Sequence, residues 1–158
     1  MTTDEKNQII ALVKREVVPA IGCTEPMAVA LAVAKSTEIL GGVPKQIELL
    51  LSANMLKNAM GVGIPGTNMV GLPIAVALGA LIGKSEYQLE VLKDTTPEAV
   101  TAGREYIAQQ RIQIGQKKDT DEKLYIEVVS HNGDDKAKVI ISGEHTHFSY
   151  IAKNGQVL

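Results

Sequence analysis

Residues 27–34 read MAVALAVA, a run in which every side chain is apolar. A helix that is hydrophobic on all sides is buried in the middle of a protein, because it has no polar face to turn toward water. Pro26 fits the first turn of such a helix, where its missing N–H costs nothing. Gly41 and Gly42, followed by Pro44, end it. The run therefore predicts a central helix on which the other elements pack.

A second apolar stretch, residues 68–82, reads NMVGLPIAVALGALI and is closed by Gly83. It predicts a second buried helix against the first. This stretch is shorter than the roughly 20 apolar residues that cross a bilayer. Gly71, Pro73 and Gly79 also interrupt it. We expect no membrane association.

The composition excludes several classes of protein. The 158 residues suit a single domain, 1–158, and with four Tyr, one Phe and no Trp its core must be aliphatic. A net charge of −2 argues against nucleic-acid binding, which needs a dense basic surface. The N-terminal sequence is polar and acidic, unlike a signal peptide, and one cysteine excludes an internal disulfide. We expect a cytoplasmic protein.

Shorter signals predict the remaining elements. Thr3 or Asp4 begins a first helix that Pro19 stops, and residues 46–51 form a short strand. Ser52 caps a helical turn, residues 85–92 form a short helix, and residues 96–110 form another. Four β-branched segments follow: 111–115, 124–130, 136–142 and 148–153. Asn132-Gly133 predicts a hairpin turn, since this pair adopts the positive φ angles required.

The fold class expected from these signals is α+β. Ala- and Gly-rich buried helices pack on a mainly antiparallel sheet, which the C-terminal third of the chain largely forms.

Cys23, the only cysteine, directly precedes the central helix. The helix N-terminus favours negative charge, so a thiolate there would be stabilised. The alternative is a small buried hydrophobe, the usual state of an unpaired cysteine. Thr24 and Glu25 beside it are poor choices for a plain core. One thiolate cannot complete a metal cluster.

The glycine-rich segment, residues 61–67, matches a dinucleotide fingerprint only as a string, because a helical segment precedes it and Pro65 occupies the turn. It also lacks the lysine of a phosphate loop. What remains is either an anion site, for instance for a substrate carboxylate, or a tight connection between two helices. Lys57 and Asn58 just before it either contact that carboxylate or are solvated.

His145 and His147 flank Thr146 just before an expected strand. Alternate residues of a strand share a face, so the two imidazoles could bind a metal together. The competing interpretation is two surface histidines. A general acid or base role for His145 is slightly better supported than a metal-ligand role, since histidine titrates near neutral pH, but two such histidines are more often surface residues.

Three motifs together resemble a known family. VPAIGCTEP (residues 18–26), NAMGVGIPGT (58–67) and IISGEHT (140–146) are similar to the L-cysteine desulfidases, relatives of the α chain of iron-sulfur L-serine dehydratases. The resemblance implies a lyase that converts L-cysteine, or L-serine, to pyruvate and ammonia without pyridoxal phosphate. It further implies a [4Fe-4S] cluster held by three cysteines, of which Cys23 matches the first. The resemblance does not name the base that takes the Cα proton, and His145 is the candidate. The expected substrate contacts are Thr24, Glu25, Asn58, Gly61, Gly63, Gly66 and Thr67.

Members of that family are longer, with their other cluster cysteines in the C-terminal half. The chain therefore corresponds to the N-terminal part of such a protein, or to a relative without the cluster. We expect the chain alone to be inactive and to bind no cluster. The missing C-terminal domain is its expected partner, besides an amino-acid substrate and a second copy of itself. The competing functions are a non-catalytic carboxylate-binding domain and a structural subunit.

Overall fold

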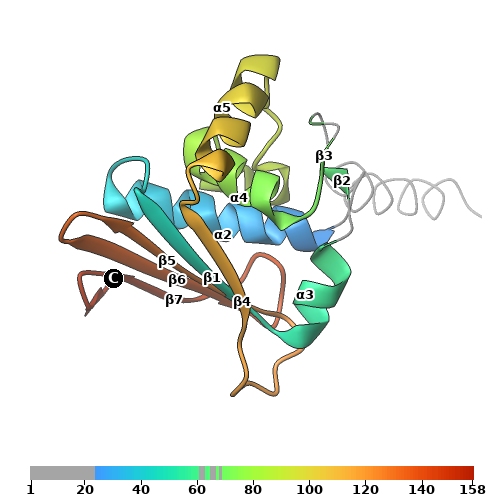
Figure 1. Ribbon diagram of the computed structural model, residues 1–158. Helices are drawn as coiled ribbons and strands as arrows, with labels where there is room; N and C mark the ends of the chain where they lie inside the picture. Colours follow the sequence, from blue (N-terminus) through green and yellow to red (C-terminus); the bar gives the residue numbers. More distant parts are fainter. Residues whose placement is uncertain (1–23, 61–62, 65–66, 68) are drawn as a thin grey trace, which may run out of the picture.

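The computed structural model of the chain describes residues 24–60, 63, 64, 67 and 69–158. One six-stranded sheet carries helices on one of its faces (Figure 1). The helices are α2 (Thr24–Leu40), α3 (Ala53–Ala59), α4 (Leu72–Leu81), the 3-10 helix η1 (Ser85–Glu90) and α5 (Pro97–Ala108). The strands of the large sheet are β1 (Gln46–Leu51), β4 (Ile112–Gln116), β5 (Tyr125–Asn132), β6 (Asp135–Ser142), β7 (Phe148–Lys153) and β8 (Gln156–Val157). The expected α+β class is confirmed.

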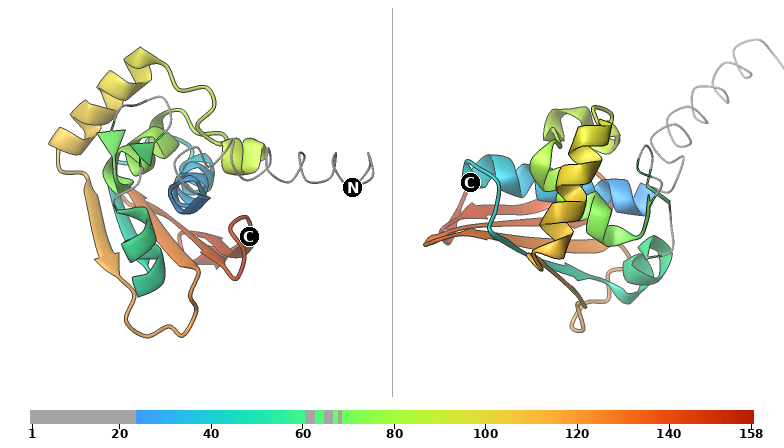
Figure 2. Two further views of the ribbon diagram at one scale, coloured as in Figure 1. Left: turned by 90° about the vertical axis from the view of Figure 1, so that its right-hand side faces the viewer. Right: turned by 45° about the horizontal axis from the view of Figure 1, so that its top comes forward.

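The central helix is α2, as residues 27–34 predict. Residues 28–34 are completely buried. The helix lies across β5, β6 and β7 on one side and against α4 on the other, and α5 packs on α4 in turn (Figures 1 and 2). Every second residue from 28 to 34 is an alanine, so neighbouring elements can approach the backbone of α2 closely there.

The sheet has the strand order β4-β1-β5-β6-β7-β8. Strand β1 pairs with β4 in parallel, and every other pair is antiparallel. Ile47, Leu49 and Leu51 alternate along β1 and turn toward the helices, where they are almost completely buried. The expected hairpin joins β5 to β6, but its two turn residues are Gly133 and Asp134, because Asn132 is still in β5 and pairs with Asp135. Gly133, the first turn residue, has a φ of +64°.

The second predicted helix is four residues too long at its start. Helix α4 begins at Leu72, whereas Met69 and Val70 form strand β3, which pairs with β2 (Gly63–Ile64). Gly71 separates the two with a φ of +92°, and a Cβ there would lie 2.9 Å from the carbonyl oxygen of Met60. Pro73 then occupies the first turn of the helix, where it is tolerated.

Three other expectations need adjustment. Strand β1 comes from the first third of the chain, yet it lies inside the sheet, between β4 and β5. The helix expected over residues 85–92 is the shorter η1, interrupted at Gln88, where φ is +56°. Helix α5 ends at Ala108 rather than near residue 110. The first predicted helix, ending at Pro19, lies outside the described residues.

Helix α5 is fastened to the rest of the domain by Tyr106. The Tyr106 hydroxyl donates a hydrogen bond to the Pro44 carbonyl at 2.6 Å, just before β1. Burial raises the pKa of Tyr106 to about 12, and the nearby Arg111 lowers it in part. Among the described residues, no helix is both long and apolar enough to span a membrane.

The crossing of α2 and α4 depends on Gly79, and we expect Gly79→Ala to destabilise the domain. A Cβ at Gly79 would lie 2.7 Å from the Ala30 carbonyl oxygen, a backbone atom that no rotamer change can move. The expected loss is about 1–3 kcal/mol in the free energy of unfolding by urea.

Gly103 in α5 provides the matched control. Its Cβ would meet the end of the flexible Ile74 side chain at 2.9 Å, which can rotate away. Gly103→Ala should change the free energy of unfolding by less than about 1 kcal/mol, because the better helix propensity of alanine offsets the crowding. Equal effects of the two substitutions would contradict the proposed role of Gly79.

Candidate functional site

The start of α2 forms one side of the candidate site. Thr24 and Glu25 are the first residues of the helix and are half-buried, whereas Pro26 behind them is buried. The N-terminus of a helix carries a partial positive charge and favours anions. Cys23, next to Thr24 in the chain, lies outside the described residues.

The loop between β6 and β7, residues 143–147, forms the other side. Gly143 begins it with a φ of +82°, a conformation that suits glycine. Two backbone bonds close the loop on itself: the His147 amide donates to the Glu144 carbonyl at 3.1 Å, and the Ser142 amide donates to the His147 carbonyl at 3.2 Å. The Gly143 amide also donates to Leu124, which ties the loop to the chain before β5. His145 is thus presented on a tightly held turn.

Glu25 and His145, 120 residues apart in the chain, meet at this point. The Glu25 Oε1 atom lies 3.7 Å from the His145 Nε2 atom, and the two side chains are 20% and 33% exposed. The Nε2 atom itself is shielded from water and has no hydrogen-bond partner among the described residues. At 3.7 Å the contact is an ion pair when the imidazole is protonated and is too long for a hydrogen bond. A neutral imidazole can accept a proton, and the carboxylate is within ion-pair distance of the cation that would result.

The glycine-rich segment is a hairpin where the structure describes it. Gly63 is exposed, Ile64 is buried, and the Thr67 hydroxyl donates to the Ile64 carbonyl at 2.8 Å. The Thr67 amide also donates to Ile64, at 3.3 Å, so this amide helps to close the turn. Gly61 and Gly66 lie outside the described residues.

The hairpin and α3 lie at the same end of the molecule as the start of α2, as all the views in Figures 1 and 2 agree. Ser52 caps the start of helix α3, since its hydroxyl accepts a hydrogen bond from the Met55 amide at 3.3 Å. The helix ends with Lys57 and Asn58 exposed. The fold therefore gathers at one end the described parts of all three motifs singled out in the sequence.

The described residues contain no group of three or more His, Cys, Asp or Glu side chains placed to bind a metal ion. His145 and His147 differ in environment, the first half-buried against Glu25 and the second exposed. A [4Fe-4S] cluster needs three or four thiolates, and the whole chain has one cysteine. This chain alone does not fit such a cluster.

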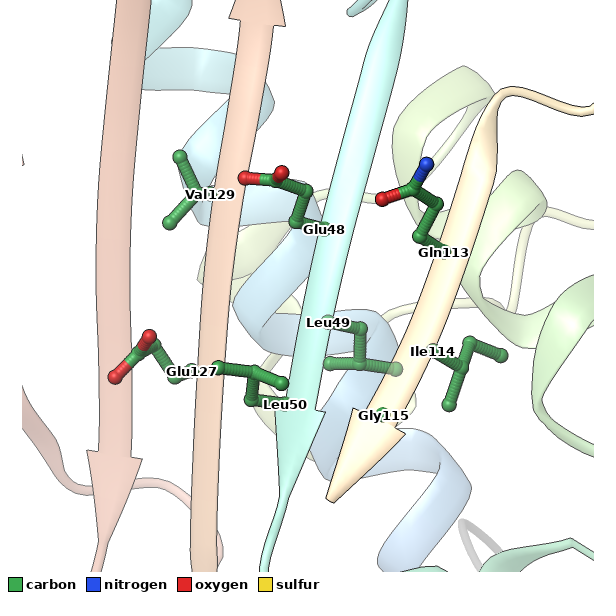
Figure 3. A pocket seen from close by; sticks show the side chains of 8 residues that line it. All are labelled: Glu48, Leu49, Leu50, Gln113, Ile114, Gly115, Glu127 and Val129. Carbon is green, nitrogen blue, oxygen red and sulfur yellow. The ribbon is translucent and has the colours of Figure 1, made fainter. Parts of the chain in front are cut away.

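A separate hollow of about 340 Å³ lies on the face of the sheet turned away from α2 (Figure 3). It is lined by Glu48, Leu49, Leu50, Gln113, Ile114, Gly115, Glu127 and Val129. It lies across the sheet from Glu25 and is not part of the candidate site. The sequence analysis missed it, although Gly115 inside an expected strand was a signal, since such glycines mark close approach or missing packing.

These features define an α+β domain with a carboxylate–imidazole pair at the start of its central helix. The chain is 67% identical, over its whole length, to a UPF0597 protein of Bacteroides fragilis, and 66% identical to one of Bacteroides thetaiotaomicron. A UPF0597 protein of Porphyromonas gingivalis is 48% identical, again over the whole chain. The chain spans little more than a third of the length of these curated relatives, 37%, 37% and 36%. No family model and no solved structure matches it.

The Glu25–His145 pair can be tested by a double-mutant cycle of Glu25→Gln and His145→Gln. At about pH 5.5, where histidines are generally charged, the coupling should reach about 0.5–1 kcal/mol in the free energy of unfolding. It should fall toward zero at about pH 8.5, where the imidazole charge is generally lost.

His147→Gln is the matched control for this cycle. His147 is on the same loop but exposed, so its coupling with Glu25→Gln should stay below about 0.3 kcal/mol at either pH. A coupling between Glu25 and His145 that is the same at both pH values would show that charge does not link them.

Proposed function

We propose that the protein of which this domain is a part is a lyase acting on L-cysteine, or on L-serine, without pyridoxal phosphate. The observation that carries the proposal is the contact between Glu25 and His145 at the start of α2. Both residues belong to motifs that resemble the L-cysteine desulfidases, and they come from distant parts of the chain. Elimination from an amino acid needs a base, and this pair supplies one.

In the proposed reaction His145 takes the proton from Cα of L-cysteine. The electron pair of the C–H bond forms a Cα=Cβ double bond, and the Cβ–S bond breaks, so that sulfide leaves with the bonding electrons. The resulting aminoacrylate takes up water and yields pyruvate and ammonia. Glu25 stabilises the imidazolium that His145 becomes, because its carboxylate lies 3.7 Å from Nε2.

The proposal puts the substrate carboxylate at the start of α2, beside this pair. The helix dipole of α2 favours a negative group at its start, where Thr24 is half-buried. Asn58 and Gly63 are exposed at the same end of the molecule and within reach of solvent. Thr67 stabilises the hairpin, since its hydroxyl and its amide both donate to the Ile64 carbonyl and close the turn.

Cys23 is proposed as one ligand of a [4Fe-4S] cluster whose other thiolates come from polypeptide outside this chain. The curated relatives are long enough to supply it, because the chain covers 37% of the Bacteroides fragilis protein. Such a cluster, when bound, supplies a Lewis acid for the leaving group. This chain's residues do not complete it, so the proton transfer above is argued from Glu25 and His145 alone.

A chimera tests the reaction. The segment of the Bacteroides fragilis relative that matches this chain is exchanged for the chain itself, and the purified protein is assayed without oxygen for sulfide and pyruvate from L-cysteine. His145→Gln in the chimera should lower kcat by about 10²–10⁴-fold, the range that a positioned general base supplies. Glu25→Gln should lower it less, since Glu25 acts through His145.

Two controls accompany the chimera. His147→Gln, on the same loop but exposed, should leave kcat within about twofold. The 158-residue chain alone should release no sulfide. An active chimera that keeps full activity with His145→Gln would refute the assigned base, and sulfide release by the chain alone would refute the need for further polypeptide.

The cluster is tested by colour. The chimera prepared without oxygen should be brown, with the broad visible absorption of an iron-sulfur protein and about four irons per chain. Cys23→Ser should remove the absorption and the bound iron, whereas Ser36→Cys, buried far along α2, should not add to either. A colourless active chimera would refute the cluster and leave the Glu25–His145 pair as the whole of the proposal.

A further inference from the structure

The outer face of the sheet, the side turned away from α2, carries two rows of side chains in register across five strands. The described helices pack on the other face or at the ends of the sheet (Figures 1 and 2). The first row is Gln113, Glu48, Val129, Lys138 and Ala152. The second row is Gly115, Leu50, Glu127, Ile140 and Tyr150. Figure 3 views the β4, β1 and β5 part of this face, with α2 behind the strands.

In both rows, the side chains on one side of the middle strand, β5, are complementary to those on its other side. In the first row Glu48 and Lys138 lie one strand to either side of Val129 and have opposite charges. In the second row Leu50 and Ile140 lie one strand to either side of Glu127 and are both apolar. A two-fold axis parallel to β5 would therefore bring Glu48 of one copy opposite Lys138 of the other, twice in each pair of molecules.

The ends of the second row match in shape. Gly115 on β4 has no side chain and lines the hollow of about 340 Å³, and Tyr150 stands two strands from β5 on the opposite side. The same axis places the Tyr150 ring of one copy over the Gly115 hollow of the other. Aligned sheets pack about 10 Å apart, a distance that an aromatic side chain fills.

The charged side chains of Lys138 and Glu48 on the outer face are also placed so that they can pair with a second copy. The Lys138 ammonium group lies 5.5 Å from the centre of the Tyr150 ring, and no carboxylate of the described residues lies within ion-pair distance of it. Glu48 lies 3.1 Å from His131 and keeps 48% of its side chain exposed. Both side chains are long enough to reach a facing sheet.

Glu127 would face its own copy across the axis, and its charge is already compensated. Its carboxylate accepts a hydrogen bond from the Tyr125 hydroxyl at 2.7 Å and lies 3.5 Å from the Lys117 ammonium group. Burial and this hydrogen bond raise the pKa of Tyr125 well above its usual value, so the hydroxyl stays a donor. The middle of the face is thus no barrier to pairing.

We propose that the outer face of the sheet binds a second copy of this chain, with a two-fold axis along β5, ion pairs between Glu48 and Lys138, and Tyr150 seated over Gly115. The interface is isologous, so each copy contributes the acidic and the basic partner alike. This inference is independent of the proposed lyase activity.

Sedimentation equilibrium of the 158-residue chain in low salt tests the proposal, and the wild-type chain should be a dimer. Glu48→Lys and Lys138→Glu should each weaken dimerisation at least ~10-fold, because each places like charges opposite one another twice. An equimolar mixture of the two variants should dimerise as well as the wild type, since both ion pairs form again in the mixed dimer, one with its original sign and one with reversed sign. Recovery in the mixture also shows that both variants are folded.

Two further variants sharpen the result. Gly115→Leu, which fills the hollow, should weaken dimerisation at least ~10-fold, whereas Lys93→Glu, an equal charge change outside the outer face, should leave it unchanged. A chain that stays monomeric at its highest soluble concentration would overturn the proposal and leave the face to polypeptide of the longer protein. A wild-type dimer whose variant mixture does not associate would overturn it equally, by assigning the dimer to another face.

Discussion

The burial of α2 between the sheet and α4 is the constraint on which the rest of the structure depends. Its apolar circumference has to be covered on every side, and β5, β6, β7, α4 and η1 cover it. Among the buried residues of α2 the one polar side chain is that of Ser36, which is fully buried. Its hydroxyl donates to the Val33 carbonyl at 2.8 Å and lies 2.8 Å from the Ser130 hydroxyl on β5. A buried hydroxyl needs such partners, so this pair fixes which turn of the helix lies over β5.

The position of the candidate site follows from the same packing. Because α2 crosses the meander of β5, β6 and β7, its first turn comes to the end of the sheet where the β6–β7 loop lies. Glu25 is on that turn and His145 is on that loop. The packing of the core thus sets the distance between these two polar side chains, although they are far apart in the sequence. Ser36 and Ser130 hold the crossing at the other end of the helix.

The sequence predicted elements whose signals are local. Strands β1 and β7 have the expected bounds, α2 is central, and a tight turn directly after Asn132 joins two paired strands. What failed was set by distant contacts. Met69 and Val70 read as helix because their apolar run is continuous, and only pairing with β2 makes them a strand. In the site, the sequence singled out Glu25 and His145 separately. Hydrophobic periodicity gives no information about contacts between residues so far apart in the chain, so their contact was not predicted. The outer-face hollow depends on strand order, which the pattern of single strands does not specify.

The place of β1 in the sheet also determines the order in which the domain can assemble. Ile47 pairs with Ile112 on one side and with Ser130 on the other, both far along the chain, whereas β5, β6 and β7 follow one another through short turns. Closing a long loop costs more entropy than closing a short one, and contacts distant in sequence slow folding. The three-stranded meander can therefore form first and provide the surface on which α2 packs. Strands β1 and β4 then complete the sheet as a later step, and a growing chain would hold β1 unpaired until its last third had been synthesised.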